Sequence, residues 1–186
     1  MDRDIYGPEI RELIHASLRQ TVPGEFSIHK DNPYYRTLTP YDMITVIEGL
    51  PLYPREVPSI LSSWAKLEEL DWHPQDFLVL DLETTGLGRG GILAFMIGLG
   101  YYEGGQFFVE QIFLPEPDAE VNSFDRVAEL MQTRSTFITF NGKTFDIPVL
   151  ESRLLYNQIW LNLREKQHID LLHIARRLWK NKAPNC

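Results

Sequence analysis

Residues 77–87 read FLVLDLETTGL, and this stretch decides how the rest of the chain is interpreted. Its four leading apolar residues are typical of a strand that is buried on both faces. Because side chains two apart in a strand point to the same side, Asp81 and Glu83 are expected to project together from the strand's end. Neighbouring carboxylates repel each other, and a divalent cation offsets that cost, since their hard oxygens suit Mg²⁺ or Mn²⁺. The alternative is an acidic strand end that meets solvent before a turn.

The composition is that of an ordinary globular protein. Apolar residues make up 44% of the 186 residues, a length that allows one full domain plus an extension. The single cysteine, Cys186, excludes a disulfide within the chain and a cysteine-based zinc site. The start lacks the apolar core of a signal peptide, and the longest apolar run, residues 92–102, is too short to span a bilayer. These features predict a cytoplasmic protein with no membrane partner.

The charge is unevenly distributed along the chain. The formal net charge is −8, which argues against a protein that binds nucleic acid by bulk electrostatics. Residues 143–186, however, hold eight Lys and Arg against four Asp and Glu, so this part carries +4 and the remainder −12. An acidic metal site beside a basic tail would suit a magnesium-dependent enzyme that acts on phosphodiesters. A solvated basic helix is the alternative.

Residues 1–75 are interpreted as an N-terminal extension. Helices are expected to begin at Pro8 and at Pro58, because proline is favoured in the first turn of a helix and apolar residues then follow at helical spacing. Residues 22–57 contain five prolines and predict an irregular stretch with short strands or turns. The main domain is then assigned to residues 76–186.

The main domain alternates strand and helix patterns. The glycine-rich residues 86–91 and the Gly104-Gly105 turn separate the first three apolar runs, so these strands are expected to form an antiparallel meander. Helices and two more strands follow, which predicts an α/β fold with a mixed sheet and helices on its faces. The later strands are expected at 92–102, 106–114, 136–140 and within 163–169, and the helices at 118–133, 147–156 and 171–180.

A third carboxylate follows the fourth strand. Residues 141–150 read NGKTFDIPVL, in which Asn-Gly marks a tight turn and Asp146 stands at the start of a helix. A helix-capping aspartate is one interpretation of Asp146. If the first and fourth strands are neighbours, Asp146 joins Asp81 and Glu83 in one acidic cluster, which is hard to explain without bound cations.

Three motifs together resemble a known family. DLETTGL, which begins at Asp81, resembles the first motif of the DEDD superfamily of 3′–5′ exonucleases, which have a ribonuclease H-like fold, and residues 141–150 resemble the second. With HIDLLHIARRLWK, residues 168–180, they are similar to the YprB-like ribonuclease H-like family over residues 76–186. We therefore expect a ribonuclease H-like mixed five-stranded sheet, with strands four and five parallel to strand one.

The resemblance implies a nuclease, of 3′–5′ exonuclease type, that hydrolyses the phosphodiester bonds of DNA or RNA by a two-metal mechanism. Matched position by position, Asp81, Glu83 and Asp146 would be the catalytic residues and would hold two Mg²⁺ or Mn²⁺ ions. The implied partner is a single-stranded or 3′-ended nucleic acid.

Three further residues are implied to bind nucleic acid. Thr84 would contact the terminal nucleotide. Asn141 and Lys143 would approach a phosphate or fix the loop that carries Asp146. A turn-forming Asn141 and a solvated Lys143 are the alternatives.

The family pattern also includes a fourth aspartate with a nearby His or Tyr that positions water, and neither has a natural match before Cys186. Asp170 lies in a motif of its own, and we expect it to support or cap the site rather than to bind metal. The flanking His168 and His173 are weaker candidates for the general base. The chain is therefore expected to be truncated before its last catalytic helix. The alternative is a catalytically inactive ribonuclease H-like module that binds nucleic acid or another protein.

Overall fold

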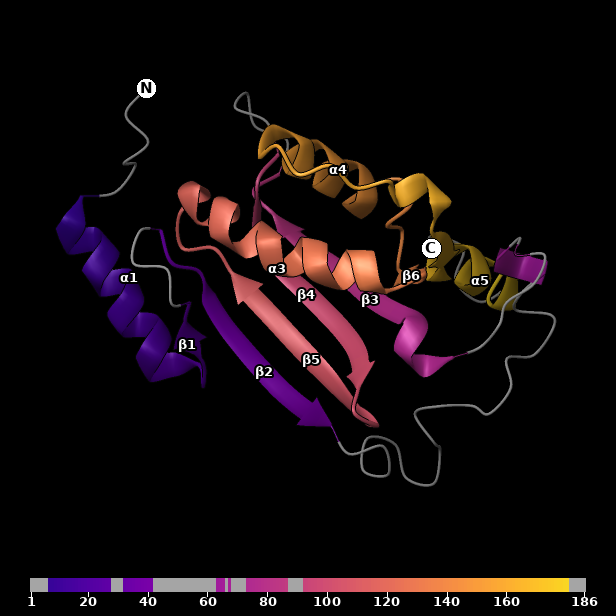
Figure 1. The fold of residues 1–186 in the computed structure, drawn as a ribbon, viewed down its shortest axis with the longest axis horizontal. Helices are drawn as coiled ribbons and strands as arrows, with labels where there is room; N and C mark the ends of the chain where they lie inside the picture. Colours follow the sequence, from indigo (N-terminus) through magenta and orange to yellow (C-terminus); the bar gives the residue numbers. More distant parts are fainter. Residues whose placement is uncertain are drawn as a thin grey trace.

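A seven-stranded mixed sheet forms the centre of the part of the chain that the structure describes (Figure 1). The structure is a computed structural model, and it describes residues 7–27, 32–41, 63–65, 67, 73–86 and 92–180. The strand order across the sheet is β1-β2-β5-β4-β3-β6-β7. The strands are β1 (Glu25–Phe26), β2 (Tyr35–Tyr41), β3 (Phe77–Thr84), β4 (Ala94–Glu103), β5 (Gln106–Phe113), β6 (Thr136–Thr139) and β7 (Gln167–Asp170).

The strand that contains the Asp-Leu-Glu sequence, β3, lies inside the sheet between β4 and β6. Strands β3, β4 and β5 form the antiparallel meander that the sequence predicts. Strand β6 pairs with β3 in parallel from Phe77 to Val79, and β7 pairs with β6 in parallel. The α/β class and the mixed arrangement are thereby confirmed, and the first and fourth predicted strands are neighbours.

Two strands come from the N-terminal extension, so the predicted count of five strands is wrong. Strand β2 pairs antiparallel with β5, from Tyr35 opposite Phe113 to Tyr41 opposite Phe107, and β1 adds to the outer edge of β2. Only the first residues of β2 alternate in burial, and Pro40 lies within the strand, so the sequence pattern is weak there. The pairing satisfies an edge of β5 whose N–H and C=O groups would otherwise lack strand partners.

The helices lie before, between and after these strands. Within the described residues they are α1 (Pro8–Thr21), α3 (Glu120–Thr133), α4 (Asp146–Tyr156) and α5 (Leu171–Leu178), with single 3-10 turns η1 (Pro74–Asp76), η2 (Pro117–Ala119) and η3 (Leu163–Glu165). Residues 63–65 are helical, but most of the helix predicted from Pro58 lies outside the described residues, as does the glycine-rich turn after Gly86. A domain boundary near residue 75 stays a prediction.

The main core lies between the sheet and helices α3 and α4, which cross one face of the sheet (Figure 1). Strand β3 contributes Leu78, Leu80 and Leu82, which alternate along the strand and are buried. The helices meet them with the buried apolar side chains of Phe124, Val127, Met131, Leu150 and Leu154. This burial fixes the register of β3, because a slip of one residue would turn Asp81 and Glu83 into the core.

The opposite face of β3 is apolar at its start and acidic at its end. Phe77 packs with Ile174 of α5 in a smaller hydrophobic cluster. Further along the strand, Val79 is 37% exposed, and Asp81 and Glu83 are also exposed. The expectation of a strand buried on both faces therefore holds only for its first residues, because α5 covers this face no further along β3.

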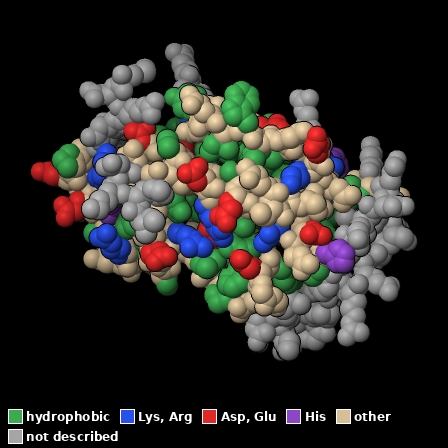
Figure 2. Space-filling model, in the orientation of Figure 1, with side chains coloured by type: hydrophobic (Ala, Val, Ile, Leu, Met, Phe, Trp, Pro, Cys, Tyr) green, Lys and Arg blue, Asp and Glu red, His purple; other side chains and the backbone are tan. Residues whose placement is uncertain are grey.

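The surface over α3 and α4 offers no obvious site for nucleic acid. Figure 2 shows acidic and basic side chains mixed over the visible part of this face, without the basic stripe that is typical of nucleic-acid binding. Within the described residues, no helix combines the length and the apolar character that crossing a membrane requires. The exposed carboxylates at the end of β3 are the candidate site residues that the sequence predicts.

Candidate metal and nucleic-acid site

Asp81 occupies an open position on the face of β3. The register places Gly98 of β4 opposite Asp81 and Gly100 opposite Val79, so β4 puts no side chain beside the Asp81 carboxylate. Both Asp81 and Glu83 are exposed, and neither forms an ion pair with a described Lys, Arg or His. The two acids stand on one side of the strand, where a ligand has access to them.

Asp146 reaches β3 from the start of α4. Strand β6 pairs only with the first three residues of β3, so later N–H groups on that side of β3 need another acceptor. Asp146, which is 4% exposed, supplies one, because its Oδ1 accepts the Leu82 N–H at 3.0 Å. Leu82 stands between Asp81 and Glu83 in the sequence. This single contact therefore brings the carboxylate of Asp146 to the acidic end of β3.

The loop between β6 and α4 is held in place by Asp170. Its Oδ1 accepts the N–H groups of Asn141 at 2.8 Å and of Leu172 at 3.0 Å, and its Oδ2 accepts the Lys143 N–H at 3.1 Å. Burial alone would raise the pKa of Asp170, but these three donors hold the pKa below its ordinary value. Asp170 thus caps α5 and fixes the loop that leads to Asp146.

The residues of this loop suit its shape. Asn141 has a φ of 66°, a left-handed conformation that asparagine tolerates better than most residues. Its Oδ1 accepts the Thr144 hydroxyl at 2.9 Å. At Gly142 a Cβ atom would lie 2.4 Å from the Cβ of Thr139, so only glycine fits. In the described contacts the side chain of Asn141 is therefore engaged within the turn.

The charge of Asp146 is poorly compensated. Burial raises its pKa, and repulsion from Asp81 and Asp170 adds to the rise, while the Leu82 N–H opposes it. No described Lys, Arg or His forms an ion pair with Asp146. A buried carboxylate in this situation is stabilised either by protonation or by an added cation.

The donor set fits Mg²⁺ or Mn²⁺ in its chemistry. The oxygens at the end of β3 are carboxylate oxygens, and Mg²⁺ is commonly bound through one or two carboxylates, with water and phosphate oxygens completing its coordination. Asp81 and Asp146 supply two such groups. Within the described ranges, however, no group of three or more His, Cys, Asp or Glu side chains is arranged to hold a metal ion. The structure thus brings Asp146 to β3 but does not gather Asp81, Glu83 and Asp146, all of them described residues, into a three-ligand group.

Of the predicted nucleic-acid-binding residues, Thr84 lies at the acidic end of β3, and Asn141 and Lys143 lie in the loop that Asp170 holds. Thr84 ends β3 directly after Glu83, at the point where the register with β4 shifts. Such an irregularity re-aims side chains at the end of a strand. Lys143 is exposed in the loop before α4 and lines a cavity together with Asp170 and residues of α5.

The sequence reasoning did not assign Trp64, Arg176 or Arg177, which line the same cavity. The available signal was the positive charge of residues 143–186, in which Arg176 and Arg177 are adjacent on one helix. Trp64 comes from a segment far away in the sequence, and no local pattern links it to α5.

His168 is partly buried and lies against the neighbouring strand β6. Its Nε2 lies 2.8 Å from the Thr139 hydroxyl, and its ring meets the edge of Phe137. Burial lowers the pKa of His168 to about 4, and the positive charge of Lys143 adds to the lowering. The ring is therefore neutral at neutral pH, and its Nε2 is hydrogen-bonded to the Thr139 hydroxyl of the neighbouring strand β6.

Comparisons with known proteins identify the family of this chain. The model of the RNase H superfamily matches residues 78–186. The uncharacterized protein YprB of Bacillus subtilis (strain 168) is 33% identical over 135 residues, which are 68% of this chain and 32% of that protein, so the chain spans about a third of its length. The EXO domain of Aedes aegypti Nibbler is similar over 67% of this chain and 52% of that chain, with 15% identity and a TM-score of 0.38. The chain is a YprB-like member of the RNase H superfamily.

Proposed function

We propose that this chain is a metal-dependent nuclease domain of 3′–5′ exonuclease type that acts on single-stranded or 3′-ended DNA or RNA. The observation that carries the proposal is the buried Asp146 carboxylate, which is repelled by Asp81 and forms no ion pair with a Lys, Arg or His of the described residues. An acid in that position is costly to the fold unless a ligand uses it. Membership of the RNase H superfamily supports the same reaction class.

The acids have distinct positions in this proposal. Asp81 and Glu83 offer exposed carboxylates on one face of β3. Asp146, at the start of α4, is held at β3 by the hydrogen bond that it accepts from the Leu82 N–H. Together they would hold two Mg²⁺ or Mn²⁺ ions. Bound there, a pair of divalent cations would stabilise the attacking and leaving oxygens of an in-line displacement at phosphorus.

The surrounding residues position these acids and the substrate. Asp170 holds the backbone of the loop before α4, so Asp146 stays in place without reorganisation during the reaction. Thr84, directly after Glu83, is proposed to contact the terminal nucleotide, and Lys143 a phosphate. Since Asp170 already accepts three N–H groups, we do not assign it as the further aspartate that the family resemblance implies.

The test is cleavage of labelled oligonucleotides by the full-length product of the gene that encodes this chain. Single-stranded DNA and RNA, each labelled at the 5′ end, should be shortened stepwise from the 3′ end in Mg²⁺ or Mn²⁺ and left intact in EDTA. The variants Asp81→Asn and Asp146→Asn should lower the rate by about 10³-fold, because each removes a ligand for cations worth several kcal/mol in the transition state.

The matched control is Asp125→Asn, which removes the same charge from an exposed position on α3. Its cleavage rate should equal that of the unmodified protein. Metal-independent cleavage, or equal rates in Asp81→Asn and Asp125→Asn, would contradict the proposal. Products that arise from cuts inside the strand would show that the same acids catalyse endonuclease cleavage and not exonuclease cleavage.

A second candidate is a nucleic-acid-binding module without catalysis. The observation that favours it is the absence, in the part of the chain that the structure describes, of a three-ligand metal group. This candidate predicts oligonucleotide binding that is equal in Mg²⁺ and in EDTA and that persists in Asp146→Asn. Binding of this kind with no detectable cleavage would select it.

A further inference from the structure

A glycine stands beside the acids on the exposed face of the sheet. Gly98 of β4 pairs with Asp81 of β3 on one side and with Gln111 of β5 on the other. Directly paired residues of neighbouring antiparallel strands project to the same face, so these three positions form one row across the sheet. Asp81 and Gln111 are exposed, and Gly98 is partly exposed. The row is therefore accessible to a ligand.

Neither packing nor backbone conformation explains a glycine at position 98. A Cβ atom there would lie 3.7 Å from the Asp81 carbonyl oxygen and 3.9 Å from the Asp81 Cβ, which are ordinary van der Waals contacts. The φ of Gly98 is not positive, and the register of β4 with both neighbours is regular at this residue. At Gly100, in contrast, a Cβ atom would lie 2.9 Å from the Phe107 ring and 3.2 Å from the Val79 Cβ. A strand glycine without such a cause is typical of a place where a ligand approaches the backbone.

Gln111 faces Asp81 across this uncovered backbone. Neighbouring strands are about 4.8 Å apart, so the two residues, which flank β4, are separated by about 10 Å, and β4 places no side chain between them. The Gln111 Oε1 accepts the Thr37 hydroxyl at 3.4 Å, and its Nε2 donates to none of the described residues. The amide nitrogen of glutamine carries two N–H donors. A ligand that reaches Asp81 over Gly98 can therefore receive a hydrogen bond from Gln111.

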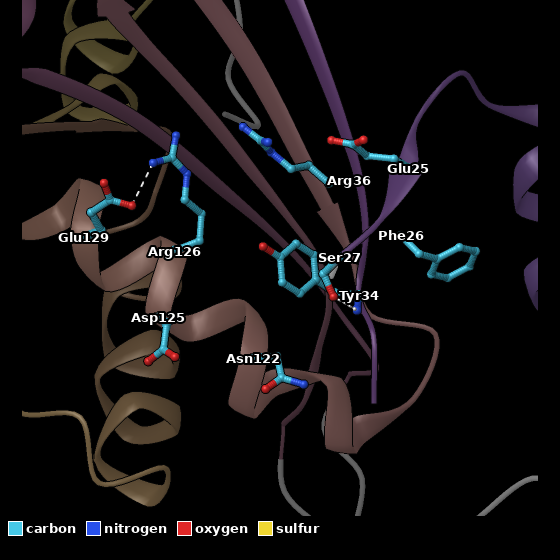
Figure 3. A pocket seen from close by; sticks show the side chains of 9 residues that line it. All are labelled: Glu25, Phe26, Ser27, Tyr34, Arg36, Asn122, Asp125, Arg126 and Glu129. Atoms are coloured by element: carbon cyan, nitrogen blue, oxygen red, sulfur yellow. Dashed lines mark hydrogen bonds and ion pairs between the residues drawn. The ribbon is translucent and has the colours of Figure 1, made fainter. Parts of the chain in front are cut away.

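The opposite face of the same strands offers no comparable row. Glu110, which precedes Gln111 on β5, is turned toward α3 and accepts hydrogen bonds from Arg36 and Arg126. Figure 3 shows the side chain of Arg126 directed at Glu129, with which it is paired at 2.9 Å, in the cavity between β2 and α3. Polar groups on that face are thus engaged with one another beneath a helix.

We propose that the nucleic-acid strand crosses β4 over Gly98, with its reacting end at Asp81, and that Gln111 donates an Nε2–H to a phosphate oxygen of the adjacent nucleotide. Gly98 lets the strand approach the sheet, because any side chain there would occupy the same space. Gln111 is a neutral donor, and its contact with phosphate fixes the register of the strand rather than its sequence. The inference rests on the proposed function, since the acids define where the reacting end lies.

The test is binding of oligothymidylate and oligouridylate to the full-length protein in Mg²⁺, measured by fluorescence anisotropy. Each oligonucleotide carries a 5′ fluorescein and phosphorothioate linkages that resist hydrolysis, so binding is measured apart from cleavage. Gly98→Val should weaken binding by about tenfold, and Gln111→Ala by about fivefold, the range expected for one lost hydrogen bond to a charged group. Gly98→Ala should weaken binding less than Gly98→Val. Gln111→Glu should weaken it more than Gln111→Ala, because the added carboxylate repels phosphate.

The matched control is Gln132→Glu, which makes the same change at an exposed position of α3, on the opposite face of the sheet. It should leave the dissociation constant unchanged. Thermal denaturation controls for folding, and Gly98→Val should be at least as stable as the unmodified protein, because valine is favoured over glycine in strands.

The outcomes separate this inference from the proposed function. An unchanged dissociation constant in Gly98→Val, or equal constants in Gln111→Glu and Gln132→Glu, would overturn the inference even if the protein cleaves nucleic acid. A lower melting temperature of Gly98→Val would show that another protein segment packs on Gly98, and would overturn it as well. The expected pattern of binding, with no cleavage of unprotected oligonucleotides, would overturn only the nuclease activity. Absence of binding to both oligonucleotides would overturn both.

Discussion

The fold treats two of its buried carboxylates, those of Glu110 and Asp146, in opposite ways. Glu110 on β5 is fully buried and accepts hydrogen bonds from Arg36 at 2.7 Å, Arg126 at 3.0 Å and the Tyr101 hydroxyl at 2.7 Å. Burial alone would raise the pKa of Glu110, but these donors hold it below its ordinary value. Asp146 has a single N–H donor from another residue, and its pKa is raised.

The contrast separates a structural acid from a candidate functional one. The charge of Glu110 is balanced by two guanidiniums of the same chain, one on β2 and one on α3. These ion pairs connect β5 with β2 and with α3. The charge of Asp146 has no such partner among the residues that the structure describes, and it is repelled by Asp81. A fold that compensates the charge of Glu110 and leaves that of Asp146 poorly compensated supports the proposal that Asp146 binds a ligand.

The largest expected effect comes from breaking the compensated site. Glu110→Gln should lower the free energy of unfolding by about 3 kcal/mol, because it removes the described counter-charge of the partly buried Arg36 guanidinium and one of the two described counter-charges of Arg126. Urea denaturation at neutral pH measures the change. Glu129→Gln is the matched control, since Glu129 is exposed and pairs only with Arg126, and it should change stability by less than about 0.5 kcal/mol. Equal losses in both variants would show that the burial of Glu110 is irrelevant.

The second expected effect concerns His168, a titratable ring that the fold keeps neutral. Its pKa is lowered from 6.5 to about 4, so the unfolded chain binds a proton that the folded chain rejects between these values. The stability that His168 contributes is therefore complete above about pH 6.5 and is lost as the pH falls toward 4. With allowance for solvent screening at the half-buried ring, we expect a loss of about 2 kcal/mol between pH 7 and pH 4.5.

Urea denaturation of His168→Gln at the same two pH values provides the comparison. Glutamine can still hydrogen-bond the Thr139 hydroxyl but does not titrate, so the variant should lose about 2 kcal/mol less stability on acidification than the unmodified protein. A variant with an unchanged pH dependence would mean that the acid loss arises elsewhere, for example at Glu110 or Asp170, whose pKa values are lowered.

Local patterns were sufficient to predict the acidic end of β3. The alternation of side chains in a strand places Asp81 and Glu83 on one face, and the Asn141-Gly142 turn predicts that Asp146 starts a helix. Both features depend on residues that are adjacent in the sequence. In the sheet, β3 and β6 are neighbours, as the sequence predicts for its first and fourth strands. The hydrogen bond from the Leu82 N–H to Asp146 then brings the third acid to β3.

The rest depends on pairs that are distant in sequence. Arg36 meets Glu110 across 74 positions, and Arg177 meets Trp64 across 113. In the sequence Glu110 is one charged residue in an ordinary strand pattern, so nothing local shows that it is buried or that β2 is needed to compensate it. The strand count and the contact between Trp64 and α5 were missed for this same reason.

The third expected effect is stabilisation of the folded protein by Mg²⁺ that binds at the poorly compensated acids. Mg²⁺ at about ten times its dissociation constant should raise the free energy of unfolding by about 1.4 kcal/mol, because it binds the folded acids and not the unfolded chain. Thermal denaturation at constant ionic strength, with and without Mg²⁺, measures the gain. Asp81→Asn should lose the gain and Glu129→Gln should keep it. A gain that persists in Asp81→Asn would place the cation at another site.

The smallest expected effect is a gain in stability on removing the charge of Asp146. In the absence of divalent cations at neutral pH, Asp146→Asn should be more stable by up to about 1 kcal/mol, because the amide oxygen still accepts the Leu82 N–H while the repulsion from Asp81 and Asp170 disappears. Since the folded pKa of Asp146 is raised, its penalty is present above that pKa and vanishes as the pH falls below the unfolded value, so the two proteins should converge in acid.

Asp170→Asn is the control, because its expected change in stability has the opposite sign to that of Asp146→Asn. The pKa of Asp170 is lowered, so its carboxylate stabilises the fold at neutral pH, and the variant should be less stable than the unmodified protein there. Urea denaturation of both variants in EDTA decides the matter. If Asp146→Asn were destabilised like Asp170→Asn, the fold would be using the charge of Asp146 as it uses that of Glu110. The contrast between a structural acid and one kept for a ligand would then be lost.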